Sequence, residues 1–212
     1  MYYNRYGMIK VIFVDWYDTL SESKFWDHLK ENDNQTLDKI NKALFGEKDI
    51  INPWMRGIWT SEEVVRLISK NMRLDYKKIF AEFVVSCQKM KFVSNKIPQL
   101  TNQLRMKGYK VIIATDNMDS FTRWTIPAMG IHDIFDGVLN SFDIKALKRD
   151  PGEDGKSLFF KDFLKKYNLK GGESILFDDG EDKNGVIGSL GIEYRKISES
   201  NSLVSELEKL LK

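Results

Sequence analysis

The stretch Val11-Ile12-Phe13-Val14-Asp15-Trp16-Tyr17-Asp18-Thr19-Leu20 decides the fold of this chain. Its first four residues are apolar and suited to a strand, a run that indicates a β-strand buried on both faces. Asp15 then ends the run with a carboxylate. Open parallel α/β sheets bind their ligands beyond the carboxyl ends of the strands. The stretch therefore predicts a buried central strand that delivers Asp15 to an active site.

Further apolar segments repeat this design along the second half of the chain. Strands are expected at residues 8–14, 111–114, 137–140, 174–177 and 192–194. Between them, helices are expected at residues 99–107, 119–129, 131–135, 157–167, 186–190 and 202–211. Strands that alternate with helices are typical of an α/β fold with a doubly wound parallel sheet.

The segment from residue 21 to residue 97 is different, because its pattern is helical throughout. Helices are expected to begin at Ser23 and to cover residues 36–45, 60–68 and 76–90, with a loop at residues 50–59 that contains Pro53 and Gly57. Four helices are too many for one crossover between two strands. The sequence therefore predicts a core made of residues 1–20 and 98–212, with residues 21–97 inserted as a helical cap.

Composition narrows the class of protein. The 212 residues include 33 basic and 31 acidic side chains, and this balance favours neither nucleic acid nor an anionic membrane as a partner. No apolar run approaches the ~20 residues that span a bilayer, and residues 1–7 lack the apolar segment of a signal peptide. The single cysteine, Cys87, fits a reducing compartment. We expect a cytoplasmic protein, either a monomer or a homodimer, that acts on a small molecule.

Three of the expected strands end in polar residues that parallel strands would bring to one edge of the sheet. These are Asp15, Thr115 and the pair Asp178-Asp179, and Lys148 follows the strand at residues 137–140. In this order the residues resemble the four motifs of the haloacid dehalogenase (HAD) superfamily of hydrolases. The position of the helical insert resembles the subclass with an α-helical cap after the first core strand.

The resemblance implies a role for each matching residue. Asp15 would be the covalent nucleophile, while Thr115 and Lys148 would stabilise the transferring group. Asp15, Asp179 and the backbone carbonyl of Tyr17 would bind Mg²⁺, with Asp178 in support. Paired buried carboxylates repel each other, and a bound cation is the usual relief. The residues that would contact the phosphorylated substrate are Thr19, Asp116 and Asn117.

Tyr17 departs from the family pattern. The first motif usually reads Asp-x-Asp-x-Thr, and its second Asp is the general acid and base, but this chain has Tyr17 there. A tyrosine with an unperturbed pKa near ~10 is a poor base at neutral pH. Three hypotheses follow: a Mg²⁺-dependent phosphatase with weak proton transfer, which we favour, a 2-haloacid dehalogenase, or an impaired binding or regulatory protein. The 2-haloacid dehalogenases also carry Tyr at this position, but they use no metal and have Ser and Asn where this chain has Asp178-Asp179.

Other interpretations of the same residues stay open at this stage. Lys145 lies close to Lys148 in sequence and could be the lysine of the third motif. Asp178-Asp179 could form a capping turn before the next helix. Arg56 could bind a substrate anion or could be an ordinary surface arginine, and the tryptophans at 26, 54 and 59 are more typical of the apolar interior of the cap.

Overall fold

The computed structural model describes residues 2–4, 7–46 and 49–212. Its centre is a five-stranded sheet in the order β5-β4-β3-β6-β7, and every neighbouring pair is parallel. The strands are β3 (Val11–Val14), β4 (Lys110–Thr115), β5 (Gly137–Asn140), β6 (Ser174–Asp178) and β7 (Glu193–Lys196). The predicted doubly wound α/β fold is therefore confirmed, and β3 lies in the middle of the sheet.

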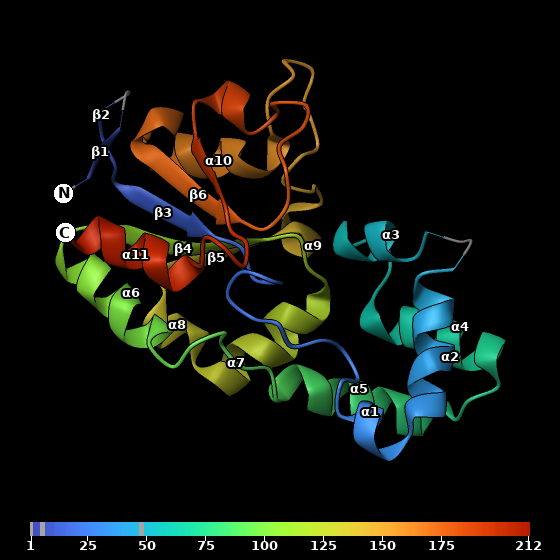
Figure 1. The fold of residues 1–212 in the computed structure, drawn as a ribbon. Coiled ribbons are helices and arrows are strands. Elements are labelled where there is room, and N and C mark those ends of the chain that lie inside the picture. Colours follow the sequence, from blue (N-terminus) through green and yellow to red (C-terminus); the bar gives the residue numbers. More distant parts are fainter. Residues whose placement is uncertain (1, 5–6, 47–48) are drawn as a thin grey trace.

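Helices cover both faces of this sheet (Figure 1). On one face, Ile12 and Val14 pack with α6 (Ile97–Met106) and α11 (Leu203–Leu211), in a cluster that also reaches α7 (Ile126–Met129) and α8 (Ile131–Ile134). On the other face, Val11 and Phe13 pack against α10 (Leu158–Lys166). Successive side chains of a strand point to opposite faces, so a strand covered on both sides must be apolar throughout. This is why the run Val11–Val14 contains no polar residue.

Between β3 and α6, the described residues form five helices that lie beyond the carboxyl ends of the strands (Figure 1). They are α1 (Leu29–Asn32), α2 (Asn34–Leu44), α3 (Ile51–Met55), α4 (Ser61–Met72) and α5 (Tyr76–Gln88). They enclose an apolar cluster of their own, in which Trp26, Trp54 and Phe83 are fully buried. Met118 from the sheet side also packs into this cluster. We still propose that the chain divides into two domains. Residues 1–20 and 98–212 would form the core, and residues 21–97 would form the cap.

Several expected elements differ from the structure. Residues 50–59 were expected to be a loop, but α3 forms there, because Pro53 lies in the first helical turn, where proline is tolerated. The carboxylate of Asp49 also accepts a hydrogen bond from the N–H of Asn52. The helix expected from Ser23 begins only at Leu29, after turns.

The remaining corrections concern shorter segments. Residues 7–8 form β2 (Gly7–Met8), which pairs with β1 (Tyr3–Asn4), so the first core strand begins at Val11 rather than at residue 8. The helix expected at residues 119–129 contains a π-helical segment, Phe121–Thr125, directly before α7. Residues 186–190 contain only a short 3₁₀ turn, Gly188–Leu190, since glycine disfavours helix. Helix α4 begins with a capping box, in which Thr60 and Glu63 each accept a hydrogen bond from the backbone N–H of the other.

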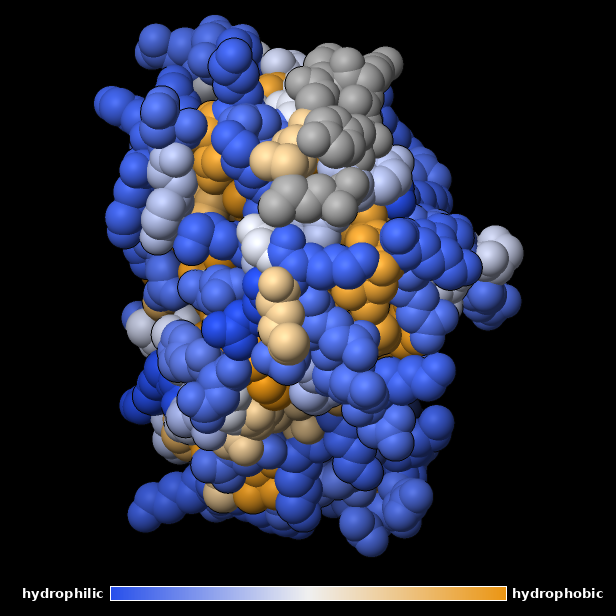
Figure 2. Space-filling model, turned by 90° about the vertical axis from the view of Figure 1, so that its left-hand side faces the viewer, coloured by the Kyte–Doolittle hydropathy of each residue, from blue (hydrophilic) through white to orange (hydrophobic). Residues whose placement is uncertain are grey.

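The side of the molecule that carries the two termini is mainly hydrophilic. Figure 2 shows this side, where apolar residues lie in several small, separate groups between polar side chains. Among the residues that the structure describes, no helix has the length and apolar character needed to cross a membrane.

Candidate active site

The carboxyl ends of three neighbouring strands place the predicted site residues on one edge of the sheet. Val14 of β3 is paired with Ile113 of β4 and with Phe177 of β6. Asp15 is therefore level with Ala114 and Asp178, and Thr115 follows one residue later. Thr115 is 1% exposed, so its hydroxyl lies at this buried edge.

Lys148 joins the carboxylates of two of these strands. Its side chain is 1% exposed, and its Nζ lies 2.8 Å from Oδ2 of Asp15 and also forms an ion pair with Oδ2 of Asp178. Two contacts hold the Lys148 backbone in place: its N–H donates to Asp116, and its carbonyl accepts from the hydroxyl of Ser157. The structure therefore brings Lys148 to the predicted nucleophile, Asp15.

Lys145, the alternative lysine, lies elsewhere. Its Nζ donates to the carbonyl of Gly57 at 3.2 Å, and its side chain is exposed. Of the two lysines considered from the sequence, only Lys148 contacts Asp15 and Asp178.

Asp178 is saturated with hydrogen-bond donors. Its Oδ1 accepts from Arg149 at 2.8 Å, from the hydroxyl of Tyr194 at 2.9 Å and from the N–H of Gly180 at 2.9 Å. Although burial alone would raise it, the charges of Lys148 and Arg149 hold the pKa of Asp178 well below its usual range. Asp178 is therefore an anion with little capacity left to bind a metal directly.

Arg149 and Tyr194 were missed in the sequence. The signal for Arg149 was present, because the third motif has Lys-Arg in place of the usual Lys-Pro. Tyr194 lies on β7 beside Leu176 of β6, and nothing in the sequence predicts its contact with Asp178. Arg149 and Tyr194 both donate hydrogen bonds to the Asp178 carboxylate. They thereby hold this carboxylate in place for its ion pair with Lys148.

Asp179 and Asp15 carry fewer contacts than Asp178: no described residue donates to the Asp179 carboxylate, and each oxygen of Asp15 has one contact, with the Trp16 N–H and with Lys148. One oxygen each of Asp15, Asp178 and Asp179 lies within 4.8 Å of the others. Within the part of the chain that the structure describes, neither the Asp179 carboxylate nor the Tyr17 carbonyl accepts a hydrogen bond from another residue. These oxygen donors fit Mg²⁺, which prefers carboxylate and carbonyl oxygens and keeps several waters.

The charges of this cluster also favour a cation. Burial raises the pKa of Asp15 to about 7 against the opposing charge of Lys148, and the Asp178 carboxylate adds to the rise. Burial and then the Asp178 charge raise the pKa of Asp179. A divalent cation between the two carboxylates would lower both pKa values and keep Asp15 ionised.

The residues expected to bind substrate have different surroundings. The Thr19 hydroxyl is buried and finds no partner among the described residues. Asp116 accepts a hydrogen bond from the Lys148 N–H, and burial raises the pKa of its carboxyl group. The side-chain oxygen of Asn117 accepts from the N–H of Met118 at 2.9 Å. The Asp116 carboxylate and the Asn117 side-chain oxygen are thus already engaged within the protein, whereas the Thr19 hydroxyl is not.

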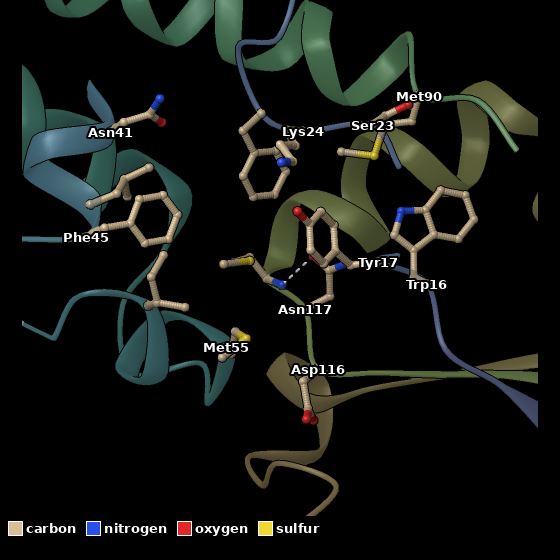
Figure 3. A pocket seen from close by; sticks show the side chains of 14 residues that line it. Trp16, Tyr17, Ser23, Lys24, Asn41, Phe45, Met55, Met90, Asp116 and Asn117 are labelled. Carbon is tan, nitrogen blue, oxygen red and sulfur yellow. Dashed lines mark hydrogen bonds between the residues drawn. The ribbon is translucent and has the colours of Figure 1, made fainter. Parts of the chain in front are cut away.

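Tyr17 borders a cavity of about 310 Å³ between the sheet edge and the inserted helices. Figure 3 shows Tyr17 projecting into the space that separates Trp16 from Phe45 and Asn41. The Tyr17 side chain is 40% exposed. The neighbouring Tyr17 side chain raises the pKa of Lys24, whose Nζ lies 6.0 Å from the centre of the ring.

Arg56, Trp26 and Trp54 each donate hydrogen bonds to other residues of the protein. The guanidinium of Arg56 donates to both oxygens of Asp150, at 2.9 and 2.7 Å, and so joins α3 to the loop that carries Lys148. The Trp26 indole N–H donates to the carbonyl of Ile79, and the Trp54 N–H donates to Asp119. These side chains connect parts of the protein to each other.

Comparisons with known proteins agree with this fold. The family model for haloacid dehalogenase-like hydrolases matches residues 9–184. A HAD family enzyme from Bacteroides thetaiotaomicron, crystallised with magnesium and inorganic phosphate, is 20% identical, with a TM-score of 0.66 over 90% of this chain and 94% of that chain. A HAD-like family hydrolase from Porphyromonas gingivalis is 16% identical, with a TM-score of 0.67 over 97% and 99%.

A dehalogenase has a similar fold as well. The 2-haloacid dehalogenase from Pseudomonas syringae pv. Tomato is 15% identical, with a TM-score of 0.62 over 96% of this chain and 98% of that chain. No curated protein matches the chain in sequence. The family match covers most of the chain, and its range, residues 9–184, spans Asp15, Thr115, Lys148 and the pair Asp178-Asp179. This chain therefore belongs to the haloacid dehalogenase-like hydrolases.

Proposed function

We propose that this protein is a Mg²⁺-dependent phosphatase that hydrolyses a small phosphorylated metabolite through an aspartyl-phosphate. The observation that carries the proposal is the second acidic residue, Asp179, beside Asp15 and Asp178 within 4.8 Å. A halide-releasing enzyme has no need for this extra negative charge, whereas a phosphatase needs a cation for its anionic substrate. The magnesium and phosphate named for the enzyme from Bacteroides thetaiotaomicron support the same chemistry.

Asp15, Asp179 and the Tyr17 carbonyl would hold the cation, with Asp178 in support. A bound Mg²⁺ reduces the repulsion between the phosphate dianion and the attacking carboxylate. Asp178 acts mainly through Lys148, because its own oxygens are already occupied by Lys148, Arg149 and Tyr194.

The chemical steps then belong to the residues at the sheet edge. An oxygen of Asp15 attacks phosphorus, and the bond between phosphorus and the leaving oxygen breaks. Lys148 and the Thr115 hydroxyl stabilise the negative charge of the transferring group. Thr19, Asp116 and Asn117 border the substrate, and water finally hydrolyses the aspartyl-phosphate.

The 2-haloacid dehalogenase is the second candidate, and Tyr17 favours it. A halide leaves without a proton, so an enzyme of that kind has no use for an acid at position 17. The acidic pair Asp178-Asp179 argues against it, because the 2-haloacid dehalogenases use no metal and have Ser and Asn at these positions. A catalytically impaired protein is the third candidate, since no carboxylic acid replaces the missing one.

A single panel separates the three candidates. Phosphate release from alkyl and aryl phosphates and halide release from 2-haloacids are measured with Mg²⁺ and with EDTA. The phosphatase proposal expects phosphate release that EDTA abolishes. Halide release that is unaffected by EDTA would assign the chain to the dehalogenases, and inactivity on all substrates would identify the impaired protein.

Mg²⁺ is expected to stabilise the fold, because it binds the native carboxylate cluster and not the unfolded chain. At ~100 times its dissociation constant the gain is about 2.7 kcal/mol, which raises Tm by about 5–10 °C. Asp179→Asn should remove most of this shift in a thermal denaturation scan. Glu181→Gln is the matched control, because Glu181 is exposed and pairs with Lys196 instead. A wild-type Tm that is unchanged by millimolar Mg²⁺ would contradict the metal assignment.

Tyr17→Asp is expected to increase phosphate release from alkyl phosphates, because it restores a group able to protonate the leaving oxygen. The gain in kcat/KM should approach ~10²-fold, the lower end of general acid–base effects. Aryl phosphates should gain least, since a phenolate leaves with little need for a proton. The measurement compares both variants on one alkyl and one aryl phosphate, with Asp15→Asn as the blank. A folded Tyr17→Asp protein that binds Mg²⁺ and gains nothing on the alkyl phosphate would refute this account of Tyr17.

A further inference from the structure

The cavity beside Tyr17 has a strongly apolar wall. Its volume is about 310 Å³, in the range of sites that enclose a small organic molecule. Its walls come from the loop after β3, from the inserted helices and from the loop after β4. The apolar and aromatic residues that line it are Trp16, Tyr17, Phe25, Leu44, Phe45, Ile51, Met55, Met90 and Met118.

One end of this cavity adjoins the proposed phosphate site. Trp16 and Tyr17 directly follow Asp15, and the Trp16 N–H donates to Oδ1 of Asp15 at 2.7 Å. Asp116 lines the same end and holds the backbone of Lys148. A phosphoryl group at Asp15 would therefore direct the rest of the substrate into the apolar space.

The polar groups on the wall are few, and several are already engaged. The Ser23 hydroxyl accepts from the N–H of Lys91, and the Asn117 oxygen accepts from Met118. The other polar groups of the wall are Lys24 and Asn41, which are exposed, the Tyr17 hydroxyl, the Asn117 amide nitrogen and the Asp116 carboxylate. A sugar phosphate would place several hydroxyl groups against a mainly apolar wall, and each hydroxyl left unpaired there is costly.

The absence of a carboxylic acid at position 17 also favours an aromatic substrate. An alkyl alkoxide needs a proton in order to leave, and position 17 offers a phenol in place of the usual carboxylic acid. A phenolate leaves far more easily, because the pKa of a phenol is near ~10. Lys24 adds positive charge to the wall of the cavity that would receive the departing phenolate.

From these two independent observations we infer that the substrate is the phosphate monoester of an aromatic hydroxyl group, an aryl phosphate. This inference rests on the proposed phosphatase function. Asp15 forms a bond to phosphorus while the P–O(aryl) bond breaks, and the electron pair leaves with the phenolate. Water then cleaves the aspartyl-phosphate, and its protons pass to the phenolate and the phosphate, so that the sum is ester plus water to phenol plus phosphate. Tyr17 is thus part of the binding surface for the ring.

The test separates binding from leaving-group reactivity. Dissociation constants of phenyl phosphate and ribose 5-phosphate are measured by calorimetry with the Asp15→Asn protein and Mg²⁺. Phenyl phosphate should bind at least ~10-fold more tightly, since its ring is removed from water. In the wild type, phenyl phosphate should also exceed ribose 5-phosphate in kcat/KM, with acetyl phosphate as a small, reactive, non-aromatic reference.

Phe45→Ser tests the cavity itself, and the exposure of Phe45 (73%) makes this change harmless to the apolar interior. It should lower kcat/KM for phenyl phosphate by about 2–10-fold, the range of one aromatic contact, and should lower kcat/KM for acetyl phosphate by a smaller factor, because acetyl phosphate has no ring. Ile58→Ser is the matched control, because Ile58 is 66% exposed and lies outside the cavity wall.

Each outcome has one meaning. Equal binding and turnover of ribose 5-phosphate and phenyl phosphate would overturn the aryl phosphate assignment and leave the phosphatase proposal intact. The aryl phosphate assignment also fails if Phe45→Ser affects both activities equally or neither. Failure of the wild type to release phosphate from all three compounds would instead refute the phosphatase proposal, and the substrate assignment would fall with it.

Discussion

Asp15→Asn is expected to reduce phosphate release to the level of the assay blank. Loss of the covalent nucleophile of a hydrolase costs about 10⁶-fold in turnover, because the remaining contacts bind the substrate without a group that attacks it. The change is isosteric, and Lys148 keeps its ion pair with Asp178. The fold should therefore survive, which a circular dichroism spectrum and a thermal scan would check.

Asp18→Asn is the matched control for this variant. Asp18 lies three residues further along the same loop, is exposed and has a positive φ of 49°, which Asn also tolerates. It should retain phosphate release within about two-fold, because Asp18 contacts none of the proposed site residues and acts on Asp179 only through its charge. Residual phosphate release by Asp15→Asn comparable to the wild type would exclude Asp15 as the nucleophile.

Lys148→Met is expected to lower both stability and activity. The ammonium is buried between Asp15 and Asp178, and its removal leaves these carboxylates without their shared cation. Breaking a buried ion pair on one side costs about 3–5 kcal/mol in the free energy of unfolding. In the folded fraction, loss of a group that stabilises developing charge should cost ~10²–10³-fold in kcat. Urea denaturation and phosphate release measure the two effects.

Lys145→Met and a double variant complete this experiment. Lys145 is exposed, so its replacement should change the free energy of unfolding by less than about 0.5 kcal/mol. Adding Asp15→Asn to Lys148→Met removes one of the repelling carboxylates and should restore part of the lost stability. Equal stability of the Lys148→Met and Lys145→Met proteins would contradict a cation shared by Asp15 and Asp178.

The sheet and the order of the site residues could be predicted because they follow from local chemistry. The part of a strand that is covered on both faces must be apolar, so Val11–Val14 and residues 175–177 are visible as short apolar runs. The carboxyl ends of parallel strands meet at one edge, so Asp15, Thr115 and Asp178 were expected to lie near each other. The structure places them at that edge, and the catalytic roles given to them remain proposals.

The contacts around Asp178 could not be predicted, because they depend on how distant segments pack. Arg149 reaches Asp178 across 29 positions of sequence, and Tyr194 reaches it from the next strand. Helix α3 was wrongly expected to be a loop, because Pro53 was taken as a helix breaker although it occupies the first turn. The Arg56 pair with Asp150 depends on this helix, so no sequence pattern indicates it.

Capture of the phosphorylated enzyme tests the central claim most directly. Tyr17 is a poor base for activating water, so the aspartyl-phosphate should break down slowly and accumulate with a substrate that leaves easily. The wild type is mixed with phenyl phosphate and Mg²⁺, quenched rapidly in acid, digested and examined by mass spectrometry. The account predicts one phosphoryl group on the peptide that contains Asp15, and none after EDTA or in Asp15→Asn. Steady phosphate release with no phosphoryl group on Asp15 at any time would contradict it.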